Sequence, residues 1–158
     1  MKNTAMEIRR AAQKDIAAIR QLFTETILSV NTADYSRGQA QCWASKGEGD
    51  EVWKERIATQ YFIVAEEDNV ITGFAALKSG GYLNSLFVHK DRQRMGVASA
   101  LLAEVERHAA GQEMESITAD VSITAKPFFL KKGYRVLQRQ VVDIGMEMTN
   151  YRMTKLLI

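Results

Sequence analysis

The stretch over residues 86–98 joins an apolar strand end, a basic loop and the start of a helix without a gap. The first N–H groups of a helix lack intrahelical partners and the helix dipole is positive there, so such a segment binds anions mainly through its backbone. Gly96 allows a phosphate to approach closely, and the small Ala98 keeps the first helical turn open. The stretch therefore predicts a binding site for a diphosphate group.

The motif formed by Gln93, Gly96 and Ala98 is not specific when it is taken alone. The same residues would also occur in a segment without a binding role, made of an ordinary strand, a solvated basic loop and a helix with an incidental glycine. The function of this segment must therefore be judged from the elements that surround it.

Hydrophobic periodicity along the chain predicts an α/β fold. The chain has 158 residues, 46% of them hydrophobic, which is enough for one domain over residues 1–158 with a sizeable core. Apolar residues recur at helical spacing after Asp15 and after Gly96. The expected strands begin at Ile8 and cover residues 61–65, 70–77, 82–88, 116–122, 134–143 and 146–157. Residues 31–49 are expected to be polar and irregular, except for a capping-box spacing that begins at Ser36 and could start a short helix.

Charge and cysteine content exclude several classes of partner. Lys plus Arg total 21 and Asp plus Glu total 19, and the net charge of +2 provides no general field for nucleic acid or a membrane. The single Cys42 excludes an internal disulfide framework and a cysteine-based zinc site, and no metal is expected. No apolar run approaches the roughly 20 residues that cross a bilayer, and the first residues lack a signal region. The sequence therefore predicts a cytoplasmic protein, and an edge strand near the C-terminus leaves monomer and homodimer both open.

With these elements in order, the chain resembles the GNAT acetyltransferases, which move an acetyl group from acetyl-CoA to an amine. The resemblance covers nearly the whole chain. The segments that carry it are Leu86-Phe87-Val88, Gln93 to Ala98, Ser122 to Phe129 and Lys132-Gly133-Tyr134. The segments that look like the bacterial YafP-like subgroup are Asp34-Tyr35-Ser36, Gln41-Cys42-Trp43, Ser122 to Phe129 and Asn150 to Lys155.

The resemblance implies the GNAT fold, a mixed, mostly antiparallel twisted sheet of about six or seven strands flanked by about four helices. Its two central strands, residues 82–88 and 116–122, are expected to splay apart and admit the pantetheine arm of acetyl-CoA. That arm would then pair with the backbone of the strands.

The resemblance also implies which residues bind acetyl-CoA as the cosubstrate. The amides from Gln93 to Ala98 would hold the pyrophosphate, and cations such as Arg94 and Lys132 would add charge-assisted hydrogen bonds, unless they are solvated surface charges. Ser122 stands where relatives often have an asparagine that contacts the arm. The expected cofactor-binding residues are Leu86, Phe87, Val88, Gln93, Arg94, Met95, Gly96, Val97, Ala98, Ser122, Phe129 and Lys132.

Acetyl transfer by direct attack on the thioester requires an oxyanion donor, a base for the amine and a means of releasing the thiolate. The resemblance makes the Val88 amide the expected oxyanion donor. Asp120 is the first candidate for the base, with a solvated carboxylate as the alternative. Phe129 stands where many relatives carry a tyrosine that protonates the thiolate, so Tyr35, Tyr82 or a water is expected to take that role. A thiol with a pKa of about 8.5 is in any case a fair leaving group near neutral pH.

Aromatic residues predict the class of acceptor. The expected substrate-binding residues are Tyr35, Trp43, Trp53 and Tyr82, because the region of the first three lies over the acceptor site in the family. Aromatic faces favour a small aromatic or amphipathic amine and can also hold a cation. The competing interpretation is that the two tryptophans only pack the helical cap.

The expected function is that of an acetyl-CoA-dependent N-acetyltransferase acting on the amine of a small molecule. Two alternatives stay open. A non-catalytic sensor of acyl-CoA is motivated by Phe129. An acetyltransferase for protein or peptide amines is disfavoured by the aromatic cap.

Overall fold

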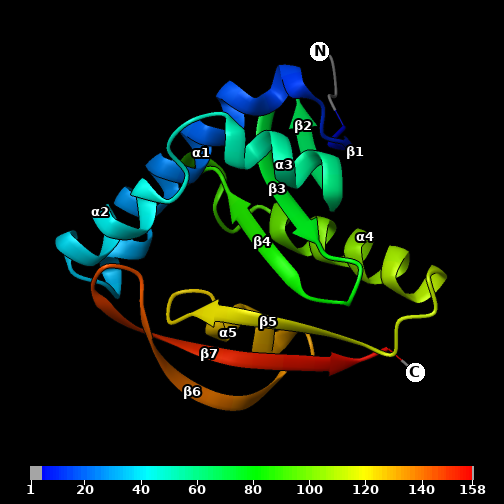
Figure 1. Ribbon diagram of the computed structural model, residues 1–158. Coiled ribbons are helices and arrows are strands. Elements are labelled where there is room, and N and C mark those ends of the chain that lie inside the picture. The colour runs from blue at the N-terminus through cyan, green and yellow to red at the C-terminus, as the bar shows by residue number, and fades with distance from the viewer. Residues whose placement is uncertain (1–4, 158) are drawn as a thin grey trace.

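The computed structural model describes residues 5–157, which form seven strands and five α-helices (Figure 1). The strands are β1 (Glu7–Arg10), β2 (Tyr61–Glu67), β3 (Val70–Leu77), β4 (Leu83–Val88), β5 (Ser116–Ser122), β6 (Arg135–Asp143) and β7 (Glu147–Leu156). The α-helices are α1 (Ile16–Ser29), α2 (Arg37–Ser45), α3 (Glu51–Thr59), α4 (Val97–Gly111) and α5 (Lys126–Lys131). Short 3₁₀ turns cover η1 (Gln13–Asp15), η2 (Asn31–Ala33) and η3 (Lys90–Arg92).

The strands form two antiparallel sheets, with the orders β1-β2-β3-β4 and β5-β7-β6 (Figure 1). A parallel bridge between Tyr82 and Thr118 joins the sheets, and the Thr118 N–H donates to the Gly81 carbonyl at 2.9 Å. The expected mostly antiparallel arrangement of seven strands is therefore confirmed. The strand arrangement is mixed, and not purely antiparallel, because this one bridge is parallel.

Strands β4 and β5 diverge from the bridge, lying close together at the right of Figure 1 and apart at the left. The His89 N–H donates to the Thr72 carbonyl, and the next pair along the register is Val88 with Gly73. Hydrogen-bonded and non-hydrogen-bonded pairs alternate along antiparallel strands. The N–H groups of Val88 and Leu86 therefore point away from β3 and into the opening.

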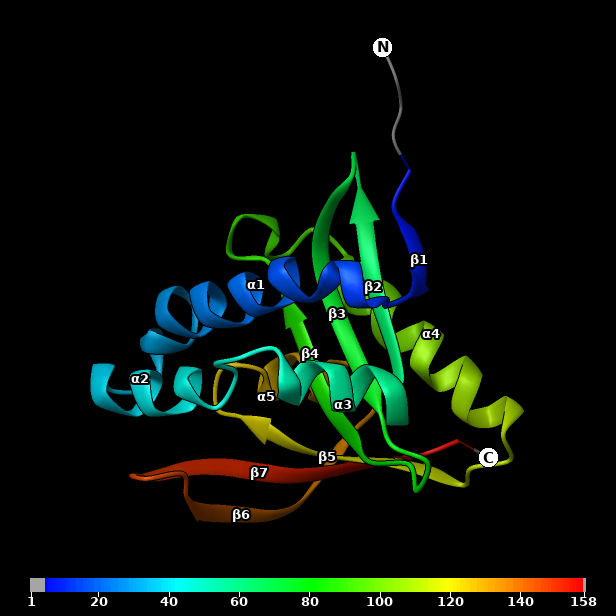
Figure 2. The ribbon, with the colours of Figure 1, turned by 45° about the horizontal axis from the view of Figure 1, so that its top comes forward.

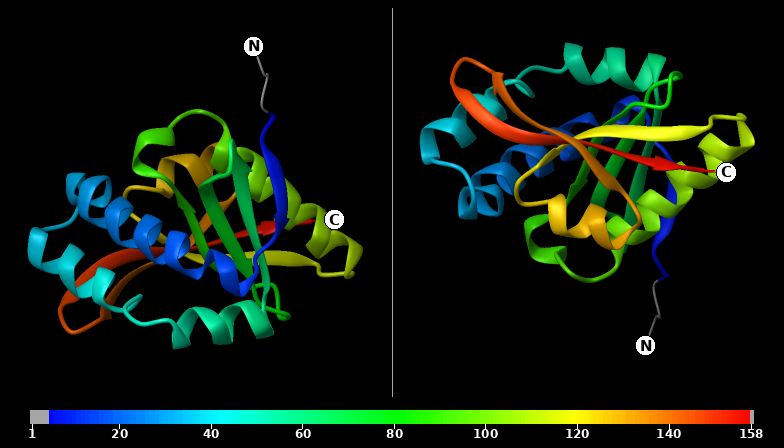
Figure 3. Two further views of the ribbon diagram at one scale, coloured as in Figure 1. Left: turned by 90° about the horizontal axis from the view of Figure 1, so that it is seen from above. Right: turned by 90° about the horizontal axis from the view of Figure 1, so that it is seen from below.

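Helices cover both faces of the first sheet. Helices α1 and α3 cross one face in Figure 2, and the two views of Figure 3 place α4 and α5 on the other. Each face has its own apolar core. The core under α1 and α3 includes Ile19, Phe23 and Trp53, whereas that under α4 includes Leu101 and Phe129.

The segment before α3 is more regular than its polar composition predicts. Ser36 Oγ accepts the Gln39 N–H at 3.1 Å, and Gln39 Oε1 accepts the Ser36 N–H at 2.9 Å. This reciprocal pair is the capping box that the spacing suggested, and it starts α2. The short helix that this spacing allowed for is therefore confirmed, and packing of Ala40 and Ala44 in the core stabilises it within an otherwise polar segment.

Candidate active site

A cavity of about 1180 Å³, here called the cleft, includes the opening between β4 and β5. It is larger than the roughly 300–1,000 Å³ of ordinary small-molecule sites. Its lining comes from α1, α2 and α3 on one side, the acceptor side, and from the loop before α4 together with α5 on the other, the α4 side. The cleft therefore has room for two reactants that meet from opposite faces.

The start of α4 is held in a defined position against the sheet. Gly73 lets the helix approach β3, because a Cβ there would lie 2.8 Å from Val97 Cγ1. Gln93 Nε2 donates to the Val88 carbonyl at 2.8 Å and fixes the loop to the end of β4. Gly96 adopts a left-handed φ of 86°, which glycine allows without strain. These contacts place the first turn of α4 along the cleft.

Several features of the cleft fit acetyl-CoA. An added Cβ at Gly96 would meet nothing within 4 Å, so the space outside the helix start is open. Thr124 lines the cleft, and its Oγ1 is buried without a hydrogen-bond partner among residues 5–157. The N–H groups of Leu86 and Val88 point into the opening, and Arg94 adds a cation to the lining. Helix amides and a cation suit a pyrophosphate, and strand amides suit an amide-bearing arm.

Most of the expected cofactor-binding residues lie together in the cleft. They are Leu86, Phe87, Val88, Gln93, Arg94, Gly96, Val97, Ala98, Ser122 and Phe129. The side chain of Met95 is not among them and is 64% exposed on the loop. Lys132 also lies outside, with its ammonium 5.7 Å from the centroid of the Phe128 ring. Lys131, the last residue of α5, does line the cleft. The role of Lys132 in cofactor binding therefore stays a prediction.

Asp120 lines the cleft, but its carboxylate is fully engaged. Oδ1 accepts from Gln140 at 2.9 Å and from Arg152 Nε at 3.0 Å, and Oδ2 accepts from the Tyr82 hydroxyl at 2.8 Å and from Arg152 at 3.2 Å. Burial alone would raise the pKa of Asp120, but the hydrogen bonds from Arg152, Tyr82 and Gln140 outweigh it and hold the pKa below its ordinary value. The structure therefore argues against Asp120 as the general base.

The hydroxyl groups of Tyr35 and Tyr82 are also committed, although both side chains line the cleft. The Tyr35 hydroxyl donates to the Thr149 carbonyl at 2.6 Å and accepts the Ile123 N–H at 2.9 Å, which ties the segment before α2 to β7 and to the end of β5. Burial, together with the hydrogen bond to Asp120, raises the pKa of Tyr82 to about 12, and burial raises the pKa of Tyr35. Neither hydroxyl holds a proton that is free to move to a leaving thiolate, which argues against Tyr35 as a catalytic acid.

The two tryptophans have different surroundings. Trp43 lines the cleft, and its ring centroid lies 5.9 Å from those of Tyr35 and Phe87. Trp53 is 0% exposed, and its Nε1 donates to the Gly47 carbonyl at 2.9 Å. The expectation that Trp53 binds substrate is therefore wrong, because α3 turns this ring into the core.

The structure adds Arg56 to the cleft, a residue that the sequence did not single out. It follows Trp53 by three positions on α3, so the two side chains lie on neighbouring parts of one helix face. In the sequence, the three-residue spacing from Trp53 was the available indication that Arg56 belongs to the site. That spacing points to the cleft only if Trp53 is buried, and the structure was needed to show its burial.

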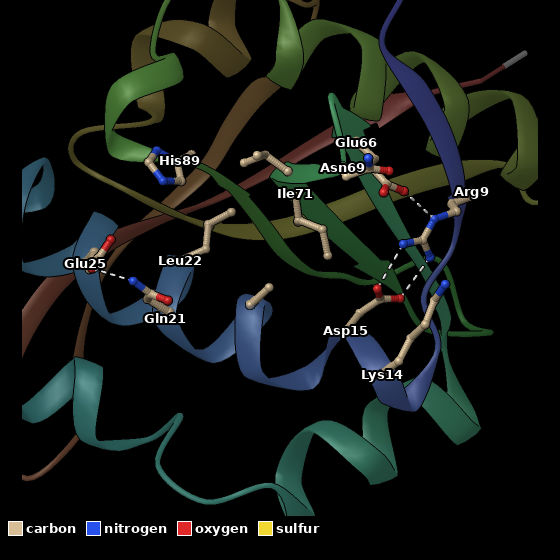
Figure 4. A pocket seen from close by; sticks show the side chains of 12 residues that line it. Arg9, Lys14, Asp15, Gln21, Leu22, Glu25, Glu66, Asn69, Ile71 and His89 are labelled. Atoms are coloured by element: carbon tan, nitrogen blue, oxygen red, sulfur yellow. Dashed lines mark hydrogen bonds and ion pairs between the residues drawn. The ribbon is translucent and has the colours of Figure 1, made fainter.

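A second cavity, of about 430 Å³, lies between α1 and the β2-β3 hairpin (Figure 4). Arg9 donates to both carboxylate oxygens of Asp15 at 2.9 Å and to Glu66 at 2.7 Å. Asp15 also accepts the Ala12 N–H at 2.8 Å. Arg9 therefore pairs with two carboxylates, and the cluster ties β1, η1 and β2 together.

No helix within residues 5–157 is both long and apolar enough to span a membrane. No group of three or more His, Cys, Asp and Glu side chains in this range is arranged to hold a metal ion.

Comparison with known proteins agrees with this geometry. Residues 31–155 match the family described as acetyltransferase (GNAT) domain. The chain is 32% identical over 149 residues to the N-acetyltransferase YafP of Escherichia coli K12, which covers 94% of each protein. A GNAT N-acetyltransferase from Rhodopseudomonas palustris superposes with a TM-score of 0.91 at 30% identity, over 99% of this chain and 97% of that one. The PaiA N-acetyltransferase of Thermoplasma acidophilum, solved with coenzyme A, has a TM-score of 0.82 at 19% identity, over 96% and 99%.

The family match covers most of the chain, and the relative from E. coli covers nearly all of it. The relative also agrees with the YafP-like segments of the sequence. The chain therefore belongs to the GNAT acetyltransferases, within the YafP-like subgroup, and acetyl-CoA is its cosubstrate.

Proposed function

We propose that the chain transfers the acetyl group of acetyl-CoA to the amine of a small molecule, by direct attack of the amine on the thioester. The observation that carries the proposal is the opening between β4 and β5, into which the Val88 N–H points. A thioester held there can be reached from the acceptor side while the rest of the cofactor lies on the α4 side. The free Cys42 suits a reducing cytoplasm, where we place the reaction.

Acetyl-CoA is proposed to bind along the α4 side of the cleft. Its pyrophosphate would accept hydrogen bonds from the amides between Gln93 and Ala98, with Arg94 beside them. Ser122 Oγ accepts the Ala125 N–H at 3.1 Å, so its own proton remains available to the arm. The buried Thr124 Oγ1 would gain the partner that it lacks within the described chain. PaiA, which shares this fold, was solved with coenzyme A, and this supports coenzyme A as the kind of ligand that the fold holds.

The Val88 N–H is proposed to stabilise the oxyanion that forms when the amine attacks. A backbone donor that is already oriented needs no reorganisation during the reaction, and removal of such a donor typically costs about 100-fold or more in rate. The position is well defined because Val88 is held twice through its carbonyl, by Thr26 Oγ1 at 3.0 Å and by Gln93 at 2.8 Å.

We propose that no protein side chain moves the proton of the amine. Neither a histidine nor a glutamate of residues 5–157 lines the cleft, and Asp120 is bound by Arg152. The amine therefore reacts as its neutral form or loses its proton to water. CoA leaves as the thiolate, because Phe129, packed edge-on against Tyr134 at 5.1 Å, has no proton to give.

The pH dependence of the rate tests this arrangement. An alkylammonium has a pKa near 10, so kcat/KM for such an acceptor is expected to rise about tenfold per pH unit between about pH 6 and 9. The variant Asp120→Asn, assayed in parallel, is expected to keep the same slope. A kcat/KM that is flat over this range in the native chain but rises about tenfold per pH unit in Asp120→Asn would restore Asp120 as the base.

A screen of acceptors tests the proposed function itself. Release of the CoA thiol is measured with aromatic amines, aliphatic amines and lysine-bearing peptides, and a reaction without acceptor controls for hydrolysis. Release that depends on a small amine is the expected result. Tight binding of acetyl-CoA without turnover on any amine would instead support a sensor. Faster turnover of peptides than of small amines would support a protein acetyltransferase.

A further inference from the structure

Arg56 is a cation in the cleft without an acidic partner. Its side chain is half-buried and lines the cleft, yet no aspartate or glutamate of residues 5–157 forms an ion pair with it. Asp120, the one carboxylate in the lining formed by residues 5–157, is already paired with Arg152. A half-buried guanidinium that stays unpaired costs stability.

The position of Arg56 is nevertheless fixed. The guanidinium carbon lies 5.1 Å from the centroid of the Trp53 ring, which is itself immobilised in the core. Burial lowers the pKa of Arg56, but a guanidinium remains charged at any physiological pH. A charge that is held in place and left unpaired in a cleft is typical of a binding group.

The partner of Arg56 is not the cofactor. Helix α3, which carries Arg56, covers the face of the first sheet opposite to α4 (Figure 2). The cations beside the helix start, Arg92 and Arg94, together with Lys131, line the cleft on the α4 side and suffice for phosphates. Arg56 therefore belongs to the acceptor side.

The surroundings of Arg56 describe the rest of the acceptor. Trp43 and Phe87 give the acceptor side an aromatic wall, and the exposed Lys46 adds a second cation. Asn84 also lines this region, with its amide donating to Gln60 at 3.4 Å. An aromatic wall with two cations and no unpaired carboxylate suits an anionic aromatic molecule.

We infer that the acceptor is an amino carboxylate, a small and preferably aromatic amine whose carboxylate is bound by Arg56. The fork of N–H donors on arginine matches the two oxygens of a carboxylate. The inference rests on the proposed function, since it specifies the substrate class of the same site. Arg56 then acts as a specificity residue that sets the orientation of the amine toward the thioester.

The test compares amines that differ only by a carboxylate. The pairs are phenylalanine with phenethylamine, tryptophan with tryptamine, and γ-aminobutyrate with propylamine. Release of the CoA thiol is measured for the native chain, for Arg56→Met and for Arg56→Lys. The control is Arg20→Met, which removes an arginine that lies outside the cleft and pairs with Asp50.

The native chain is expected to prefer the carboxylate-bearing member of the pairs that it accepts. Arg56→Met is expected to lower the ratio of kcat/KM within a pair by about 10-fold to 100-fold, through the KM of the acceptor. The KM for acetyl-CoA should not change, and Arg56→Lys should retain part of the preference. The amines of a pair differ in basicity, but that difference is the same in every variant and cancels in the comparison.

A second readout separates binding from a structural role. Removal of an unpaired, half-buried charge is expected to leave the melting temperature of Arg56→Met unchanged or higher, whereas loss of a structural residue would lower it. Two results would overturn the inference and leave the proposed function intact. One is that the native chain has equal kcat/KM for the two amines of a pair. The other is that Arg56→Met lowers kcat/KM for both amines by the same factor. Binding of acetyl-CoA with no turnover on any amine would overturn the proposed function and this inference with it.

Discussion

Replacement of Gly96 by valine is expected to weaken acetyl-CoA binding about 100-fold. Gly96 has a φ of 86° at the start of α4, a conformation that a β-branched residue adopts only with strain. The valine side chain would also occupy the open space outside the helix start, where we place the pyrophosphate. The helix start must therefore move or the phosphates must retreat, and either change removes backbone hydrogen bonds.

Calorimetric titration of the variant with acetyl-CoA measures this effect. Gly111→Ala is the matched control, because Gly111 lies at the other end of the same helix and a Cβ there meets nothing within 4 Å. The control is expected to bind acetyl-CoA as the native chain does. Native-like affinity in Gly96→Val would contradict the assignment of the pyrophosphate to this loop.

Replacement of Arg9 by methionine is expected to lower the free energy of unfolding by about 3 kcal/mol. Arg9 bridges Asp15 and Glu66 (Figure 4), and the Asp15 side chain is only 5% exposed. The variant leaves a buried carboxylate with only the Ala12 N–H as donor. Urea unfolding measures the loss. The exposed pair of Arg20 with Asp50 is the control, and Arg20→Met should cost less than about 1 kcal/mol.

The same pair gives a pH signature. Hydrogen bonds from Arg9 hold the pKa of Asp15 below its ordinary value, against the opposing effect of burial. The stabilisation is therefore fully present above the unfolded pKa of about 3.9 and is lost as the pH falls through the lower, folded pKa. The stability difference between the native chain and Arg9→Met should shrink in acid. A difference that is constant down to about pH 2 would mean that Arg9 acts through packing alone.

The fold could be predicted from local patterns because its main elements carry strong periodicity. The helix after Gly96 and the alternation from Ile117 to Val121 depend on neighbours a few residues away, and both lie where the sequence indicates. The α2 helix was harder to predict, because its signal was one capping box at Ser36 within a polar segment. The hydrogen bonds of this capping box start a helix in a segment whose polar composition alone suggests a loop.

The segment proposed to bind the cofactor stands out in the sequence because it is one continuous strand, loop and helix, and most of it lines the cleft. The acceptor side does not stand out in this way, because its contacts join residues far apart in sequence. Asp120 forms an ion pair with Arg152 from β7 and accepts a hydrogen bond from Gln140 of β6, and the Tyr35 hydroxyl donates to the Thr149 carbonyl. No spacing along the chain reveals such pairs. A residue that looks like a free base or acid in the sequence can therefore prove to be a structural connection.

Trp53 illustrates the same limit at the level of one helix. Its aromatic character suggested a substrate contact, but the phase of α3 decides which side chains turn inward. That phase buries Trp53 and leaves Arg56 at the cleft, resting on the ring. In the proposed site, Trp53 would therefore act on the acceptor only through the arginine that it positions.

A crystal structure with acetyl-CoA bound tests the proposed placement of the cofactor. We expect the thioester oxygen to lie about 3 Å from the Val88 nitrogen, between β4 and β5, and the pyrophosphate to lie on the amides of the loop from Gln93 to Ala98. A thioester oxygen without contact to Val88, or a pyrophosphate away from that loop, would contradict it.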